Sequence, residues 1–82
     1  MISFIVPAYN EERLLGATLQ AINAVVQVLD EPCEVIVVDD GSTDRTAEIG
    51  REHGAQVVPV AYRLIAATRN AGARVAQGDM FI

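Results

Sequence analysis

Acidic and polar side chains gather in two short segments, each of which directly follows a run of apolar residues. The first, residues 7–12, reads Pro-Ala-Tyr-Asn-Glu-Glu, and the second, residues 39–44, reads Asp-Asp-Gly-Ser-Thr-Asp. A carboxylate such as Asp39 accepts hydrogen bonds from a nucleobase edge or a ribose hydroxyl, and the ring of Tyr9 can stack on a planar base. The two segments are therefore the default candidates for a ligand-binding site.

Each of these residues also has a purely structural interpretation. Asp39 and Asp40 can build a turn and cap the helix that follows, as aspartate commonly does. Tyr9 can be a half-buried packing residue. Glu11 and Glu12 suit the first turn of a helix, where acidic side chains interact favourably with the helix dipole whatever the function. Residue type and spacing leave both interpretations open.

Two arginines, Arg69 and Arg74, lie in an alanine-rich stretch near the end of the chain. A guanidinium group pairs well with diphosphate oxygens, and the acidic chain offers few other cations. The alternative is a solvated helix face. His53 has no cysteine or aspartate partner at ligand spacing, and Cys33 is the only cysteine. We therefore expect no metal or catalytic role for His53 and no internal disulfide.

Short apolar runs alternate with helical patterns along the whole chain. We expect strands over residues 2–6, 35–38 and 56–60, and the start of a fourth strand at Met80. A first helix is expected from Glu11, capped by Asn10, since apolar residues then recur on one face until Pro32 stops it. These residues are Leu15, Leu19, Ile22, Val26 and Leu29.

Capping and stop signals define two further helices. The second is expected to be capped by Ser42 or Thr43, to run to about Glu52 and to stop at Gly54. The third is expected over residues 64–77, where alanine is frequent and Gly78 follows.

Strict alternation of strands and helices predicts an α/β fold with a doubly wound, mostly parallel sheet, built as one unit over residues 1–82. In such sheets ligands bind beyond the carboxyl ends of the strands. Both polar segments fall there. The chain stops inside an apolar run without a stop signal, so we expect the natural sequence to continue past Ile82 and this unit to be truncated.

The composition and the motifs that are missing exclude several classes of function. Apolar residues form 51% and charged residues 21% of the 82 residues, as in a globular domain. The formal net charge of −5 argues against binding of nucleic acid through its phosphates. Residues 17–29 are too few and too polar to span a bilayer, and no signal peptide is recognisable. Neither G-x-G-x-x-G after the first strand nor G-x-x-x-x-G-K-[ST] is present, which excludes a dinucleotide oxidoreductase and a phosphate-loop nucleotidase.

Three sequence blocks carry a family resemblance. They are I-V-P-A-Y-N-E-E at residues 5–12, V-V-D-D-G-S-T-D at residues 37–44, and R-N-A-G with A-Q-G-D over residues 69–79. Their order and spacing closely resemble family 2 glycosyltransferases. The resemblance implies a GT-A fold, the nucleotide-diphospho-sugar transferase type, with strand order three, two, one, four.

The resemblance also implies roles for individual residues. The segment of Pro7, Ala8 and Tyr9 would wall the nucleotide base. Glu11 would lie near the ribose, Asp39 would hold the base edge with Asp40 as a weaker match, and Arg69 would lie near the diphosphate. Catalytic and metal-binding residues are not assigned within the chain. The family's Asp-x-Asp, which binds Mg2+ or Mn2+, would follow the strand that begins at Met80, so the ligands are expected downstream of Ile82.

One departure from the family concerns the phosphate contact. Members often carry small or Gly-Lys residues shortly before the Arg-Asn-x-Gly block, where this chain has Arg63, Leu64 and Ile65 followed by two alanines.

The expected function is transfer of a sugar from a nucleoside diphosphate donor, a uridine one by expectation, to an unknown acceptor. This chain would supply donor recognition, and the 82 residues alone should transfer no sugar. The alternative is a non-catalytic nucleotide-binding or assembly module, with self-association through an uncovered sheet edge. A cytoplasmic location is expected, and the alternative is that the full-length protein is peripheral to the membrane.

Overall fold

The computed structural model describes residues 1–61, 65–78 and 80–81. Within these residues four strands, all parallel, form a single sheet between two layers of helices. The strands are β1 Ile2–Ala8, β2 Cys33–Asp40, β3 Gln56–Val60 and β4 Met80–Phe81, and the helices are α1 Leu15–Val28, α2 Thr46–Glu52 and α3 Ile65–Val75. The spatial order is β3-β2-β1-β4, which confirms the predicted parallel α/β topology.

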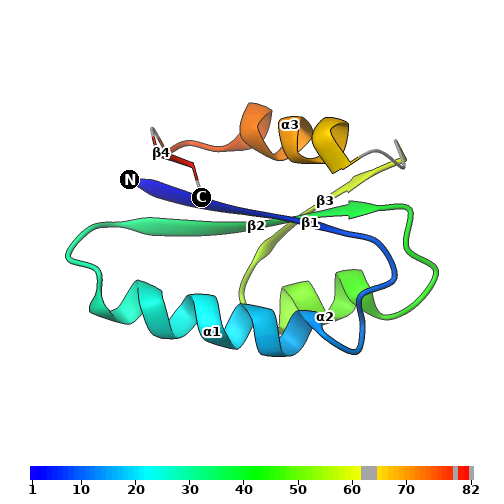
Figure 1. Cartoon of the computed structure of the whole chain (residues 1–82), viewed down its shortest axis with the longest axis horizontal. Coiled ribbons are helices and arrows are strands. Elements are labelled where there is room, and N and C mark those ends of the chain that lie inside the picture. The colour runs from blue at the N-terminus through cyan, green and yellow to red at the C-terminus, as the bar shows by residue number, and fades with distance from the viewer. Residues whose placement is uncertain (62–64, 79, 82) are drawn as a thin grey trace.

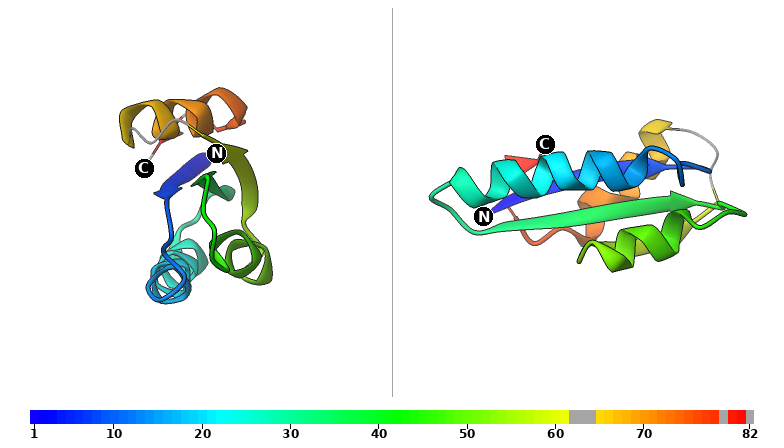
Figure 2. Two further views of the ribbon diagram at one scale, coloured as in Figure 1. Left: turned by 90° about the vertical axis from the view of Figure 1, so that its right-hand side faces the viewer. Right: turned by 90° about the horizontal axis from the view of Figure 1, so that it is seen from below.

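Helices cover both faces of the sheet. α1 and α2 lie on one face and α3 lies on the other (Figures 1 and 2). On the first face Leu15 and Leu19 of α1 pack with Val37 of β2. On the second face Ile36 and Val38 pack with Ala71 of α3. Successive β2 residues therefore serve opposite faces, as the pleat of a strand buried on both sides requires.

The first two strands are longer than the apolar runs predicted. β1 continues through Pro7 to Ala8, and β2 extends from Cys33 to Asp40, because the two strands stay paired from Ile2–Cys33 to Ala8–Asp39. A proline is tolerated where a strand has no partner on its N–H side. β4 pairs with β1 only at Ile2 and Ser3 among the described residues, so it does not reach Pro7.

The first helix begins later than predicted. α1 starts at Leu15 instead of Glu11, and residues 12–14 form a turn in which the N–H of Leu14 donates to the carbonyl of Glu11 (3.0 Å). Asn10 does not cap it, because its φ of 50° is left-handed and its side chain bonds elsewhere. The acidic residues thus precede the helix and are absent from its first turn.

The second helix also begins later than predicted. α2 starts at Thr46, and neither Ser42 nor Thr43 caps it. The carboxylate of Asp44 accepts the N–H of Thr46 instead (2.9 Å). The predicted end is confirmed, since α2 closes at Glu52 and Gly54 follows with a φ of 80°, which favours glycine.

The third helix ends at Val75, two residues before the predicted end. The chain already turns toward β4 there, because the N–H of Gln77 donates to Glu34 Oε2 (2.9 Å) and the N–H of Gly78 donates to Ser3 Oγ (3.1 Å). The predicted start of this helix at Leu64 lies outside the described residues, as do Arg63, Asp79 and Ile82.

Candidate nucleotide-binding site

The two polar segments meet at one end of the sheet. β1 and β2 are neighbours in register, with Ala8 opposite Asp39, so the loops that follow them leave the sheet side by side. Figure 1 shows both loops at the end of the sheet remote from the N-terminus. The prediction that the segments gather beyond the carboxyl ends of the strands is therefore confirmed.

Hydrogen bonds tie the two loops together. The N–H of Asn10 donates to Ser42 Oγ (2.8 Å), and the N–H of Thr43 donates back to Asn10 Oδ1 (2.9 Å). One residue further on, the N–H of Glu11 donates to Thr46 Oγ1 (2.8 Å). These bonds join residues more than thirty positions apart in the sequence. We call this set of contacts between residues 10–12 and 42–46 the loop clasp.

Asp44 completes the loop clasp from the second loop. Its Oδ2 accepts the N–H of Glu12 (3.2 Å), and its Oδ1 accepts both the N–H and the hydroxyl of Thr46. Desolvation raises the pKa of the Asp44 carboxyl, but the hydrogen bonds from Thr46 and Glu12 outweigh it and hold the pKa below its ordinary value of 3.8. The ionised form of Asp44 is therefore the one that the folded loops favour.

The two adjacent aspartates at the end of β2 face opposite sides of the sheet. Asp39 follows the pleat of Val37 toward α1 and α2, and its Oδ1 accepts the N–H of Ser42 (3.1 Å). Asp40 follows Val38 toward α3, where Thr68 Oγ1 donates to its Oδ2 (2.9 Å). Both are buried, with 8% and 4% of their surface exposed. The two carboxylates therefore lie on opposite faces of the sheet at the end of β2.

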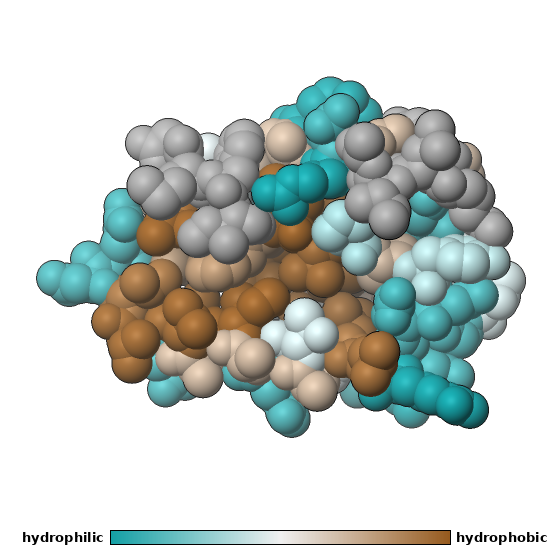
Figure 3. Space-filling model, in the orientation of Figure 1, coloured by the Kyte–Doolittle hydropathy of each residue, from teal (hydrophilic) through white to brown (hydrophobic). Residues whose placement is uncertain are grey.

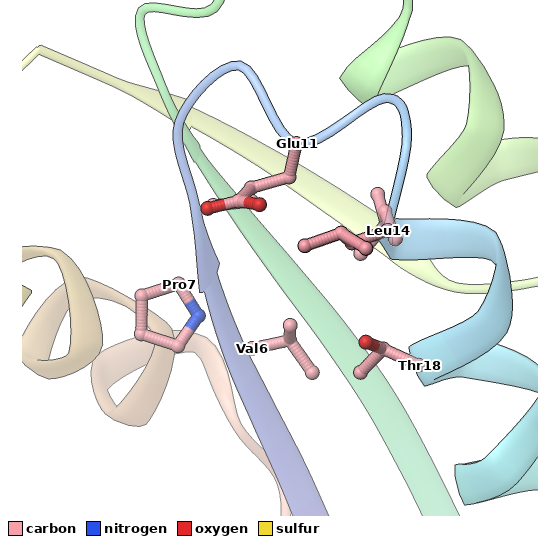
Figure 4. A pocket seen from close by; sticks show the side chains of 7 residues that line it. Val6, Pro7, Glu11, Leu14 and Thr18 are labelled. Carbon is pink, nitrogen blue, oxygen red and sulfur yellow. The ribbon is translucent and has the colours of Figure 1, made fainter.

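The other predicted site residues also lie on different faces of the sheet. Pro7 lies across β1 from Val6, on the α3 side, whereas Ala8 packs with the core beneath α1 (Figure 4). Tyr9 stands at the tip of the first loop with 43% of its surface exposed. Arg69 lies on α3 and is half-buried, and its Nη1 donates to the carbonyl of Ile5 (3.3 Å). The guanidinium thus lies above β1, where further N–H donors can serve a ligand.

A pocket opens between the end of β1 and the start of α1. It has a volume of about 230 Å³, below the range of about 300–1,000 Å³ that small-molecule sites occupy. Glu11 lies at its upper end in Figure 4, and Thr18 is the other polar side chain of the lining. The lining residues are Val6, Pro7, Ala8, Glu11, Leu14, Leu15 and Thr18. The pocket alone is too small for a nucleotide sugar.

Sequence reasoning missed the contributions of Ser42, Asp44 and Thr46. Serine, aspartate and threonine often cap helices or bond to the nearby backbone, and this preference was the sequence signal that they bond to a loop backbone. The partners lie more than thirty residues away on the other loop, and only the strand register brings them together.

Neither a metal cluster nor a membrane span is found in the described part of the chain. No group of three or more His, Cys, Asp or Glu side chains there could hold a metal ion. The described helices are also too short or too polar to cross a bilayer. His53, at the end of α2, directs its Nδ1 to the carbonyl of Ile49 (3.0 Å).

The fold is a parallel α/β sheet with two tied loops at its carboxyl end, and comparison with known proteins identifies the family. The profile of glycosyl transferase family 2 matches residues 3–82. The chain therefore belongs to glycosyl transferase family 2, and the GT-A fold expected from the sequence blocks is confirmed by its structural neighbours.

Individual relatives support this membership. An uncharacterized glycosyltransferase of Bacillus subtilis, YkcC, is 38% identical over 74 residues, which cover 90% of this chain and 22% of the relative. The mannosyltransferase PcManGT of Pyrobaculum calidifontis, solved with GDP-Man and Mn2+, superposes with a TM-score of 0.82 at 31% identity over 98% of this chain and 25% of the other.

A third relative carries a different donor. Glucosyl-3-phosphoglycerate synthase of Mycobacterium tuberculosis, solved with Mn2+, UDP-Glc and phosphoglyceric acid, superposes with a TM-score of 0.72 at 33% identity. The match covers 99% of this chain and 31% of the synthase. The chain thus spans less than a third of the length of each of these three relatives.

Proposed function

We propose that this chain forms the nucleotide-recognition part of a glycosyltransferase that uses a nucleoside diphosphate sugar, with a uridine nucleotide as the expected base. One observation carries the proposal. The loop after β1, which holds Tyr9 and Glu11, is tied to the loop that follows Asp39 and Asp40 at the carboxyl end of β2. Membership of family 2 and neighbours solved with GDP-Man or UDP-Glc support it.

The proposed contacts follow the chemistry of the side chains. Tyr9, exposed at the loop tip, stacks on the base, with Pro7 and Ala8 forming the wall beside it. Asp39 accepts hydrogen bonds from the base edge, with Asp40 on the α3 face as the weaker candidate, and Glu11 accepts from a ribose hydroxyl. Arg69 supplies the positive charge toward the diphosphate, using donors beyond the one that holds the Ile5 carbonyl.

We also propose that a divalent metal, Mg2+ or Mn2+, accompanies the donor, as it does in the two structural neighbours solved with Mn2+. Such an ion neutralises the leaving diphosphate. Its ligands are expected in the family's Asp-x-Asp, which would follow the strand that begins at Met80 and so lie downstream of Ile82. The described side chains then recognise and orient the nucleotide.

Substitution of the two aspartates tests the site. We expect Asp39→Asn and Asp40→Asn in the full-length protein to weaken UDP binding by about 1–3 kcal/mol each, the usual loss for a charged hydrogen-bond partner. Calorimetry with UDP and Mn2+ measures this. Asp30→Asn, the same change in the loop after α1 at the opposite end of the sheet, is the control and should bind as the wild type does.

The two aspartates need not contribute equally, because they face opposite sides of the sheet. A loss confined to Asp40→Asn would assign the base to the α3 face, which also carries Pro7 and Arg69. Unchanged affinity in both variants would remove the end of β2 from the site. A parallel titration with GDP distinguishes the base, since the structural neighbours include donors with either nucleotide.

An assembly role is the second candidate, and surface hydrophobicity favours it. Val25 and Val28 near the end of α1 are exposed by 46% and 81%, and Leu14, just before the start of α1, is exposed by 64%. Figure 3 shows apolar surface on the face of the molecule where the edge of the sheet meets α1. Among the described residues β4 pairs with β1 only at Ile2 and Ser3, and the described part of β4 does not extend along the rest of β1. Light scattering of the 82-residue chain across a concentration series tests whether copies associate through this face.

A further inference from the structure

The hydroxyl group of Thr46 sits between the two loops of the candidate site. Thr46 is the first residue of α2 and is fully buried, with 0% of its surface exposed. Its Oγ1 accepts the N–H of Glu11 at 2.8 Å and donates its own proton to Asp44 Oδ1. The bond to Glu11 spans 35 residues of sequence. Thr46 is therefore a direct link between the loop after β1 and the loop after β2.

A hydroxyl group is suited to this position because it donates one hydrogen bond and accepts others. Serine offers the same atoms with one methyl group fewer. Valine has nearly the shape of threonine but offers neither function, so it would leave the partly buried N–H of Glu11 without its acceptor. Substitution by serine and by valine can therefore separate the effect of the hydrogen bonds from the effect of side-chain shape.

Ser42 makes a second link, closer to the proposed base site. Its Oγ accepts the N–H of Asn10 (2.8 Å), the residue after Tyr9, while its own N–H donates to Asp39 Oδ1 (3.1 Å). Asp39 and the loop tip that carries Tyr9 are therefore connected through a single residue. Asn10 itself is held in a left-handed conformation, with a φ of 50°.

We propose that the hydroxyl groups of Ser42 and Thr46 are positioning groups for donor binding. They touch no donor atom in this scheme, which rests on the proposed function. They hold Tyr9 and Glu11 at a fixed spacing from Asp39. The two loops are therefore already ordered when the protein folds, before the donor binds. Preorganisation of this kind raises affinity because less conformational freedom is lost when the ligand binds.

Hydroxyl removal in the full-length protein tests the proposal. Thr46→Val and Ser42→Ala should each raise the dissociation constant for UDP, measured by calorimetry with Mn2+, by about tenfold, the effect of one lost hydrogen bond. Thr46→Ser should restore binding to near the wild-type value. Amide hydrogen exchange should become faster at Asn10 and Glu11 in the first two variants and stay slow in the third.

Two control variants distinguish a loss of loop positioning from a general loss of protein stability. Ser3→Ala makes the same change as Ser42→Ala at the opposite end of β1, where the Ser3 hydroxyl accepts the N–H of Gly78. Ile22→Val removes one methyl group from the packing of α1 and lowers stability away from the loops. Both should bind UDP as the wild type does at a temperature where every variant is folded.

The outcomes distinguish this proposal from the one on which it rests. Wild-type protein that binds neither UDP nor GDP would overturn the proposed function, and donor positioning with it. Wild-type binding together with unchanged affinity in folded Thr46→Val and Ser42→Ala would overturn the positioning role alone. If Thr46→Val does not fold, Ser42→Ala decides, because Ser42 is only half-buried and its loss leaves the core intact.

Discussion

At the scale of single residues, the carboxylate of Asp44 accepts several of the hydrogen bonds of the loop clasp. It accepts hydrogen bonds from the backbone of Glu12 and from the backbone and hydroxyl of Thr46. These bonds hold the pKa of the Asp44 carboxyl below 3.8 in the folded protein, against the effect of desolvation. The ionised carboxylate therefore stabilises the folded state relative to the unfolded one.

This lowered pKa predicts how stability depends on pH. The contribution of Asp44 is fully present above its ordinary pKa of 3.8 and is lost as the pH falls through the lower pKa of the folded state. Asp44→Asn should therefore be less stable than the wild type at about pH 6, and the difference should shrink toward about pH 3. Urea unfolding at a series of pH values measures it. A difference that is constant over this range would show that the charge of Asp44 has no part in the loop clasp.

The sequence predicted the position of the site, because the types of its residues indicate ligand binding, but it did not predict the contacts between the loops. The crowding of Asp, Glu, Asn and Tyr after two apolar runs indicated where ligands bind, and the register of β1 and β2 confirmed that the segments meet. The opposite directions of Asp39 and Asp40 follow from the pleat, once β2 is known to extend through both. The bond between Thr46 and Glu11 could not be predicted, because it depends on where two helices begin.

At the scale of elements, local capping signals were overridden by contacts between loops. Asn10, Ser42 and Thr43 are good helix caps by type, yet each bonds across to the other loop. α1 therefore begins at Leu15, four residues after its predicted start at Glu11. α2 begins at Thr46, four or three residues after its predicted cap at Ser42 or Thr43. The ends of these helices were predictable, since Gly54 and the polar stretch before Pro32 act on the local backbone alone.

The packing of α3 on the sheet yields a prediction about a glycine. A Cβ atom added at Gly72 would lie 2.6 Å from Ile5 Cγ2 and 2.8 Å from Val38 Cγ2, which belong to stiff, buried side chains. Gly72→Ala should therefore lower the free energy of unfolding by about 1–3 kcal/mol, the usual cost of overpacking. Denaturant unfolding followed by circular dichroism measures this change.

Gly16 in α1 provides the matched control. A Cβ atom there would lie 3.5 Å from the His53 ring, an ordinary contact. Gly16→Ala should leave the protein as stable as the wild type or up to about 1 kcal/mol more stable, because alanine favours helices. Equal effects of the two substitutions would contradict the close packing of α3 against β1 and β2.

At the scale of the whole molecule, the alternation of strands and helices was enough to predict the parallel sheet, and the sequence blocks were enough to predict its order. The chain belongs to glycosyl transferase family 2, and its structural neighbours superpose over 98% and 99% of its length. The donor base, the sugar and the acceptor depend on side chains that the fold does not determine. The chain covers only 25% and 31% of those neighbours.

The central claim is that a nucleotide binds where the loops after β1 and β2 meet. Amide chemical-shift mapping of the protein during titration with UDP and Mn2+ tests it most directly. We expect the largest changes at Tyr9, Glu11 and Ser42, beside the ends of β1 and β2, and no change at Glu31 and Cys33, at the opposite end of the sheet. Changes confined to that opposite end, or none at saturating UDP and GDP, would show that no nucleotide binds between these loops.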